Sequence, residues 1–240
     1  VDWIDGHIDL AYVAIMGRDI QIPCEDKNSA CISIPDLVQS PINTFFGTIY
    51  TSPNYKEFGY DHSGNRKAAF KAGEKQLHVY QELEAASLLS IQHEGCELKD
   101  SLSMLLLMEG ADPIRSPEDV AWWREQGLRL VGLTWSVGTR YSGGNSSGGP
   151  ITEEGIELVK ALDEHSVVHD VSHLSDEAFD CLFEHATGKI VASHSNSRAL
   201  LETSSQRNLR DDQAKAIFNR GGVVGLNLCT QFLVKPKKTL

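Results

Sequence analysis

The first residues suited to metal chemistry are His7 and Asp9, at the end of an apolar run near the start of the chain. Side chains two positions apart on a strand point to the same face, so this imidazole and this carboxylate can bind one divalent cation together. The pattern is short, and by itself it is weak. A hydrogen-bonded strand end is the plain alternative.

A single carboxylate, Glu109, follows the aliphatic run Leu105–Met108. Such a carboxylate must be paired, protonated or bound to a metal, because burial removes its hydration. Its two oxygens can bridge two cations, which predicts Glu109 as the shared ligand of a binuclear site. An ion pair with a neighbouring lysine or arginine is the alternative.

Two further apolar runs end in a Ser-His pair, at His173 and at His194. In a parallel barrel such strand ends lie side by side on the rim where barrel enzymes place their catalytic groups. Together with His7, Asp9 and Glu109, these two histidines favour a metal site over separate structural roles. The sequence therefore predicts five metal ligands at one end of a barrel.

Other catalytic classes find less support in the sequence. We expect neither Ser172 nor Ser193 to be activated by the histidine that follows it, because adjacent strand residues face opposite ways. No GxSxG motif lies directly between a predicted strand and a predicted helix, as a nucleophile elbow requires. A Walker or Rossmann phosphate loop is also absent from the sequence. Asp170 can lie behind the site and orient a ligand histidine, or it can serve the fold alone.

The elements that position these residues follow from the alternation of short apolar runs with longer amphipathic segments, which is typical of strand-helix units. Nearly continuous apolar strands favour a parallel sheet covered on both faces. We expect strands at Trp3–Asp9, Asn43–Thr51, Ser103–Glu109, Leu128–Thr134, Ser166–Ser172, Lys189–His194 and Gly222–Leu228. We expect helices at Asn65–Ser87, Pro117–Glu125, Glu153–His165, Asp176–His185 and Asp211–Asn219.

This pattern predicts an α/β fold, a (β/α)8 TIM barrel of the metal-dependent hydrolase type. A chain of 240 residues suffices for one such barrel, and we expect a single domain over residues 1–240. The eighth strand has no candidate, since only residues 229–240 follow the seventh. We therefore expect a barrel that is incomplete at its C-terminal end, either as part of a longer chain or as a shortened relative.

Composition narrows the range of partners. With 22 Lys and Arg against 33 Asp and Glu, the formal net charge is −11, which disfavours nucleic acid and anionic membranes as partners. We expect a cytoplasmic protein without a membrane span, and an exported form whose leader has been removed is the alternative. Five cysteines lack any CxxC spacing, so we expect reduced, mostly buried thiols at Cys24, Cys31, Cys96, Cys181 and Cys229.

Taken together, these motifs resemble the membrane (renal) dipeptidases, peptidase family M19, and in particular their bacterial members. The motifs occur in family order from near residue 3 to near residue 228. They are Asp5-Gly6-His7-Ile8-Asp9-Leu10, Met108-Glu109-Gly110, Leu133-Thr134-Trp135, Asp170-Val171-Ser172-His173-Leu174-Ser175, Ser193-His194-Ser195-Asn196-Ser197-Arg198-Ala199-Leu200, and Arg207-Asn208-Leu209 followed by Asp211-Asp212.

The resemblance implies a dipeptidase with two zinc ions per chain, and it leaves a homodimer open. It assigns one zinc to His7 and Asp9 and the other to His173 and His194, with Glu109 as the bridge. The hypothesis for the reaction is attack on the peptide carbonyl of a dipeptide by water that the two metals activate.

The resemblance also assigns Arg207 to the substrate carboxylate, because a guanidinium offers that group two parallel donors. A surface ion pair near Asp211 and Asp212 is the alternative. Glu109 and Arg207 are thus the predicted catalytic residues.

Two departures from the family pattern concern the substrate. Trp135 stands where mammalian members have a histidine that polarises the substrate, and a tryptophan cannot act as that electrophile. Arg140, Tyr141 or Asn145 in the following loop can replace it, so Trp135, Arg140 and Tyr141 are predicted to contact the substrate. The second departure is the absence of the aspartate that follows the last barrel strand in the family.

Two competing hypotheses remain. One is another amidohydrolase-type metallohydrolase acting on an N-acyl amino acid or a lactam, although such enzymes usually bridge their metals with a modified lysine where this chain has Glu109. The other is a catalytically inactive barrel homologue that binds a metal or a peptide.

Overall fold

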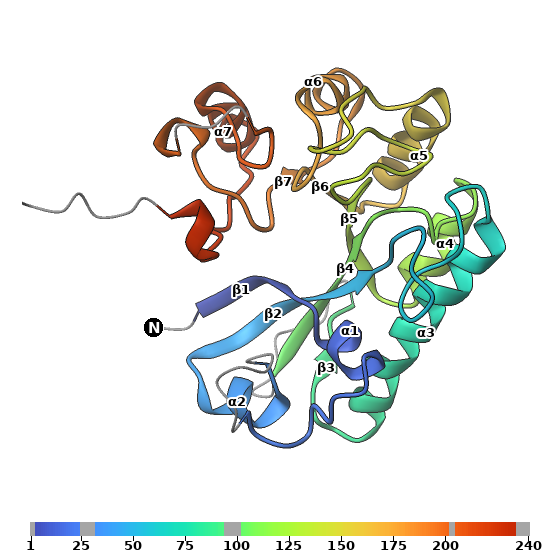
Figure 1. Ribbon diagram of the computed structural model, residues 1–240, viewed down its shortest axis with the longest axis vertical. Helices are drawn as coiled ribbons and strands as arrows, with labels where there is room; N and C mark the ends of the chain where they lie inside the picture. Colours follow the sequence, from blue (N-terminus) through green and yellow to red (C-terminus); the bar gives the residue numbers. More distant parts are fainter. Residues whose placement is uncertain (1–2, 25–31, 94–101, 202–204, 234–240) are drawn as a thin grey trace, which may run out of the picture.

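The fold is described from a computed structural model, which defines residues 3–24, 32–93, 102–201 and 205–233 (Figure 1). Cys31, Cys96 and the basic ending at 235–238 lie outside the described residues.

A curled sheet of parallel strands organises the molecule, with strand order β1-β2-β4-β5-β6-β7. The short strand β3 pairs with the first residues of β4, and β5 pairs with the last ones. The α/β prediction with a parallel barrel-type sheet is therefore confirmed, and the described strands form an open part of a barrel. Their bounds are β1 Trp3–Ile8, β2 Ile42–Tyr50, β3 Ser90–Ile91, β4 Ser103–Glu109, β5 Leu128–Gly132, β6 Val168–Asp170 and β7 Ile190–Val191.

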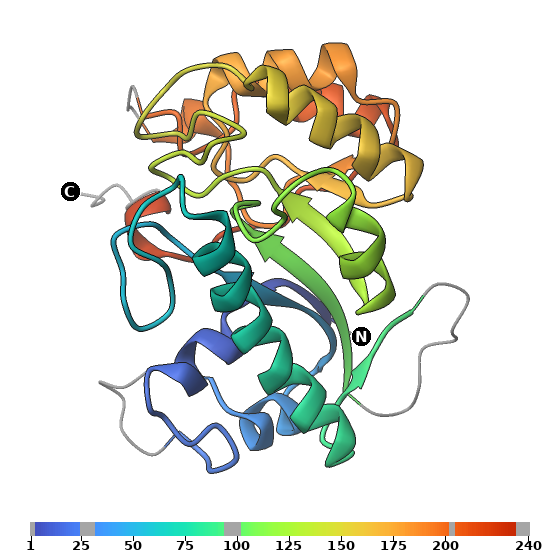
Figure 2. The same cartoon turned by 90° about the vertical axis from the view of Figure 1, so that its right-hand side faces the viewer.

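Helices cover the outer face of the sheet. Figure 2 shows α3 running along the N-terminal part of the sheet, with α5 and α6 packed together over its C-terminal part. The five predicted helices are confirmed, whereas α1 and α2 were not predicted. The bounds are α1 Leu10–Ile15, α2 Ile34–Gln39, α3 Arg66–Ala85, α4 Asp119–Glu125, α5 Glu153–Glu164, α6 Asp176–His185 and α7 Asp211–Asn219, with 3₁₀ turns at Arg198–Leu200 and Thr230–Phe232.

The helix ends follow local chemistry in most cases. Thr152 and Ser175 accept the backbone N–H groups of Gly155 and Ala178 and so begin α5 and α6. Apolar residues on the inner faces of these helices, such as Leu158 and Leu182, are buried against the sheet. This packing fixes the outer layer against which the strand ends are held.

The predicted strand at 222–228 is wrong. Val224 makes only an isolated parallel bridge with Ala192, and Leu226 and Leu228 are 78% and 71% exposed. The segment bonds to the backbone at Ala192 on one side, and no described strand pairs with its other side. A ladder needs an extended partner, and β7 beside this segment is only two residues long.

Strands β6 and β7 are also shorter than predicted, and both end before the histidines. His173 lies in a turn with φ of 71°, a left-handed conformation that non-glycine residues rarely adopt. Such backbone strain is found most often at functional sites.

The described cysteines, Cys24, Cys181 and Cys229, are free thiols, but none of them is buried. The expectation of mostly buried thiols is wrong for these three residues. Among the described residues, no helix combines the length and the apolar character that crossing a membrane requires.

Candidate metal centre

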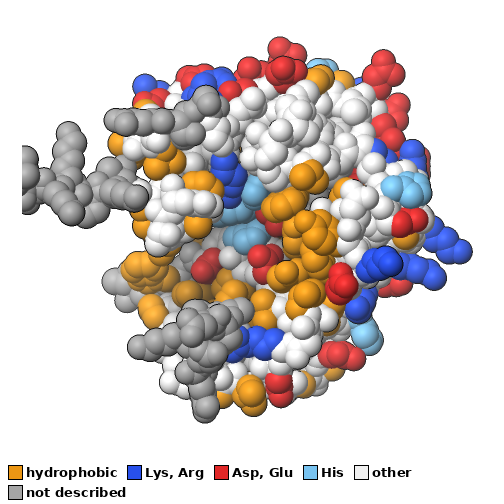
Figure 3. Space-filling model, viewed as in Figure 1, with side chains coloured by type: hydrophobic (Ala, Val, Ile, Leu, Met, Phe, Trp, Pro, Cys, Tyr) orange, Lys and Arg blue, Asp and Glu red, His pale blue; other side chains and the backbone are white. Residues whose placement is uncertain are grey.

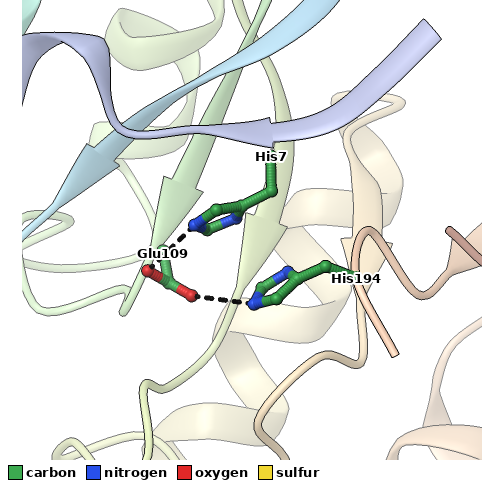
Figure 4. Close-up of side chains that lie close together, drawn as sticks. All are labelled: His7, Glu109 and His194. Carbon is green, nitrogen blue, oxygen red and sulfur yellow. Dashed lines mark ion pairs between the residues drawn. The ribbon is translucent and has the colours of Figure 1, made fainter. Parts of the chain in front are cut away.

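Three side chains from distant parts of the sequence point toward one another at the carboxyl ends of the strands (Figure 4). His7 comes from β1, Glu109 is the last residue of β4, and His194 follows β7. One ligand atom from each lies within 4.8 Å of the other two. Nitrogen and oxygen donors at this spacing can share a metal ion.

Asp9 and His173 complete the cluster around Glu109. Glu109 Oε2 lies 3.7 Å from His7 Nε2, which is in turn 3.4 Å from Asp9 Oδ1. Glu109 Oε1 lies 3.2 Å from His173 Nε2 and 3.6 Å from His194 Nε2. The structure thus brings all five predicted ligands together, with one oxygen of Glu109 toward each pair.

A glycine allows the two ends of the sheet to meet here. A Cβ atom at Gly6 would lie 2.3 Å from the carbonyl oxygen of Ser193, closer than real Cβ atoms come. Because Gly6 has no side chain, β1 can approach the backbone beyond β7. The His7 and His194 rings then lie in contact, tilted by 40° with their centroids 3.9 Å apart.

The cluster is electrically asymmetric. Burial lowers the pKa of His7, but the charge of Glu109 and the hydrogen bond with Asp9 outweigh it and raise that pKa to about 9. Burial lowers the pKa of His173, and burial with the positive charges of His7 and Arg207 lowers that of His194 well below its ordinary value. A proton therefore belongs to the His7 side of the metal-free cluster, while the other two histidines are neutral.

The residues fit a divalent cation. His173 Nδ1 donates to Asn145 Oδ1 at 2.9 Å, so the Nε2 atom of neutral His173 carries a lone pair. That atom lies 3.1 Å from His194 Nε2, and Glu109 Oε1 is buried beside both without a hydrogen-bond donor. Acceptors that face one another in a buried pocket are the arrangement that a bound cation satisfies, and imidazole and carboxylate are ligands of zinc.

An aromatic wall flanks the cluster. Trp135 lies 6.0 Å from the His173 ring and 5.4 Å from the Tyr50 ring, between ring centroids, and Tyr50 stacks on Phe58. In Figure 3 histidines and carboxylates line the floor of a hollow that apolar side chains border. Trp135 is thus placed beside the site, as its predicted substrate contact requires.

The structure does not bring Arg140 and Tyr141 into this cluster. Arg140 Nη1 bonds to the Asp112 carboxylate at 3.0 Å, and the fully buried Tyr141 donates its hydroxyl to the carbonyl of Ile114. These polar groups hold the loop after β5 in place. Their placement does not support the prediction that they contact the substrate.

Arg207 lies next to the cluster. Its Nη1 donates to the carbonyl of His194 at 3.1 Å, its guanidinium lies 5.4 Å from the Phe232 ring, and the side chain is almost buried. It makes no ion pair with a carboxylate within the described part of the chain; Asp212 pairs with Arg210 instead. The surface ion pair considered for Arg207 is therefore absent, and its charge is available to an anionic ligand.

The geometric reason for the expectation about the serines, that serine and histidine face opposite ways, is wrong for Ser193. Ser193 Oγ lies 2.8 Å from Nδ1 of its own neighbour, His194, because the chain has left the strand and alternation no longer applies. Sequence reasoning also missed Thr48, whose hydroxyl donates to Asp9 Oδ1 at 2.5 Å. The only feature of the sequence that could have indicated Thr48 is its place near the carboxyl end of β2, two residues before the last one.

Comparisons with known proteins agree with this geometry. The profile of a family described as membrane dipeptidase (peptidase family M19) matches residues 1–240. The chain is 37% identical over 149 residues to an uncharacterised protein in the pqqA 5′ region of Klebsiella pneumoniae, covering 58% of this chain and 54% of that protein. It is 34% identical over 149 residues to an uncharacterised protein in the PQQ-III 3′ region of Acinetobacter calcoaceticus, covering 58% and 47%.

The chain therefore spans about half the length of these curated relatives. Among solved structures, a metallopeptidase from Rhodobacter sphaeroides, liganded with a phosphinate mimic of the dipeptide L-Ala-D-Ala, has a similar fold. Its TM-score is 0.83 at 23% identity, over 97% of this chain and 75% of that one. With the family profile matched over its whole length, this chain belongs to the membrane dipeptidase family, peptidase family M19.

Proposed function

We propose that this protein is a zinc-dependent dipeptidase that binds two zinc ions per chain. One observation carries the proposal: the buried carboxylate of Glu109 turns Oε2 toward His7, which lies beside Asp9, and Oε1 toward His173 and His194. Membership of a dipeptidase family supports the same reaction class.

In this proposal His7 and Asp9 hold one zinc, His173 and His194 hold the other, and Glu109 is shared. Zinc at such a site supplies Lewis acidity and lowers the pKa of water toward neutrality. His7 must lose its proton when the metal binds, since its raised pKa keeps it protonated in the metal-free cluster at neutral pH.

Arg207 binds the free carboxylate of the substrate. Support comes from its burial beside His194 and from the lack of an ion pair with any described carboxylate. A guanidinium fixed at one distance from the metals selects substrates whose carboxylate lies one residue from the scissile bond. This favours dipeptides over internal bonds of proteins.

The experiment is a substrate comparison on zinc-loaded protein, with zinc content measured in parallel. Dipeptides, N-acyl amino acids and lactams are assayed at equal concentration, and dipeptides are expected to be hydrolysed fastest. Faster turnover of acylated amino acids or lactams would favour the broader amidohydrolase-type alternative. Bound zinc without turnover of any of them would favour an inactive barrel.

Arg207→Met tests the carboxylate contact, with Arg210→Met as the matched control because Arg210 pairs with surface carboxylates. Arg207→Met is expected to raise KM for dipeptides and to leave zinc content unchanged. Equal KM values in the two variants would remove Arg207 from the substrate site.

A further inference from the structure

Ser193 connects a buried carboxylate with one of the candidate metal ligands. Its Oγ lies 2.5 Å from Asp170 Oδ2 on one side and 2.8 Å from His194 Nδ1 on the other. Ser193 and Asp170 are both buried, 4% and 3% exposed. The three groups form a chain behind His194, on the side away from Glu109.

The direction of these hydrogen bonds follows from the number of protons. The Asp170 carboxylate can only accept, and its other oxygen, Oδ1, already accepts the backbone N–H groups of Ser172 and Ser193 at 3.0 and 2.9 Å. The hydroxyl proton of Ser193 therefore points to Asp170 Oδ2. Ser193 Oγ then accepts from His194, so the ring proton of His194 lies on Nδ1.

We propose that Asp170 and Ser193 are positioning residues that hold His194 in its Nδ1–H tautomer and so keep Nε2 open to a metal ion. The inference rests on the proposed function only in taking that ligand to be a metal. In this arrangement Asp170 and Ser193 set the tautomer of His194. The same order of groups excludes Ser193 as a nucleophile, because its proton goes to Asp170 and not to the histidine.

An isosteric substitution should reverse the direction of the hydrogen bonds between Asp170, Ser193 and His194. In Asp170→Asn the amide oxygen must stay on the two backbone N–H groups, so the amide NH₂ faces Ser193 and donates to it. Ser193 then donates to His194 Nδ1, at 2.8 Å the nearer of its two remaining acceptors, since Ser172 Oγ lies 3.1 Å away. The ring proton of His194 moves to Nε2, where the metal would bind. Ser193→Ala removes the link instead and leaves both tautomers of His194 accessible.

The experiment is a zinc titration against a chromogenic chelator, using zinc alone and the intact protein. Substitutions of residues that orient a ligand histidine weaken metal binding about 10-fold to 100-fold. We expect about 100-fold weaker zinc binding for Asp170→Asn and about 10-fold for Ser193→Ala. The double variant should bind about 10-fold more tightly than Asp170→Asn alone, because without the hydroxyl the wrong tautomer is no longer imposed.

Asp163→Asn is the matched control. Asp163 is also paired with a histidine of β6, since its Oδ1 lies 2.6 Å from His169 Nε2, but that pair lies away from the cluster. This variant should keep the zinc affinity of the unmodified protein. A purely structural Asp170 would instead give a double variant no tighter than Asp170→Asn, and that result would overturn the proposal.

If Asp170→Asn does not fold, Ser193→Ala alone decides, and unchanged zinc affinity in it would overturn the proposal. Zinc binding is measured here, and not hydrolysis. Protein that binds zinc but cleaves no dipeptide would therefore overturn the proposed function and leave the positioning role intact.

Discussion

His7 and Glu109 lie on β1 and β4, strands of six and seven residues, whereas His173 and His194 lie in turns after β6 and β7, strands of three and two residues. Glu109 is held in sheet register opposite Tyr50 and Gly132. His7 lies where β1 departs from regular pairing, between Asp5 and Ile8, next to the close contact at Gly6. The second pair depends on hydrogen bonds that the two histidines donate to the side chains of Asn145 and Ser193.

The two pairs, His7 with Glu109 and His173 with His194, are the two halves of the cluster, and they also differ in charge. The pKa of His7 is raised, while those of His173 and His194 are lowered. One half of the cluster thus lies on strands and holds a proton, and the other is held by side chains and offers lone pairs. The comparison teaches that one site can be assembled from backbone geometry on one side and from a side-chain network on the other.

Glu109→Gln should have the largest effect, because the Glu109 carboxylate faces His7 with one oxygen and His173 and His194 with the other. Replacing the shared carboxylate by an amide removes the charge that both pairs face. Loss of metal-assisted catalysis should lower kcat/KM for dipeptides by about 10³-fold, equal to about 4 kcal/mol. Steady-state kinetics with a dipeptide measure this fall, and the zinc content of the variant is determined in parallel. Full activity with Gln at this position would contradict a bridging role.

The charge difference predicts how the stability of the metal-free protein depends on pH. A raised pKa of His7 stabilises the folded state fully below about pH 6.5 and loses that effect as the pH rises through about 9. The loss should amount to about 3 kcal/mol. Urea unfolding with a chelator present, at several pH values, measures it. His7→Gln should abolish this part of the pH dependence, and an unchanged profile would refute the assignment.

Gly6→Ala tests the contact that brings the halves together. The added methyl group would meet the Ser193 carbonyl at 2.3 Å, so β1 must move away from the backbone beyond β7. We expect the free energy of unfolding to fall by about 2 kcal/mol. The control is Gly64→Ala, where the new group faces only the His62 ring at the surface. Equal stability of both variants would show that the close approach is relaxed in solution.

The loss of zinc affinity in Asn145→Ala and in Thr48→Val compares the two halves of the cluster directly. Each removes one side-chain bond to a candidate ligand, His173 or Asp9. Zinc affinity should fall about 10-fold for Asn145→Ala. It should fall less than about threefold for Thr48→Val, because β1 and His7 still position Asp9. Chelator competition measures both, and a larger loss in Thr48→Val would reverse the comparison.

The sequence predicted the five candidate ligands because each lies at the end of an apolar run, and the ends of parallel strands share one edge of a sheet. It also predicted the main helices from their periodicity. The segment at 222–228 was misjudged because an apolar run forms a strand only where partners exist on the sheet. Arg140 and Tyr141 were misjudged because their partners, Asp112 and Ile114, are far away in sequence.

Residue types and their order along the chain determined the fold class, the family and the donor set, since these depend on local hydrophobicity and on the chemistry of each side chain. Only the tertiary structure decided which way each donor faces, because that depends on contacts between distant segments. The approach of Gly6 to Ser193 and the bonds from Asp170 to His194 are contacts of this kind. They bring the histidines and Glu109 together, with the Nε2 atoms and the carboxylate oxygens facing one another.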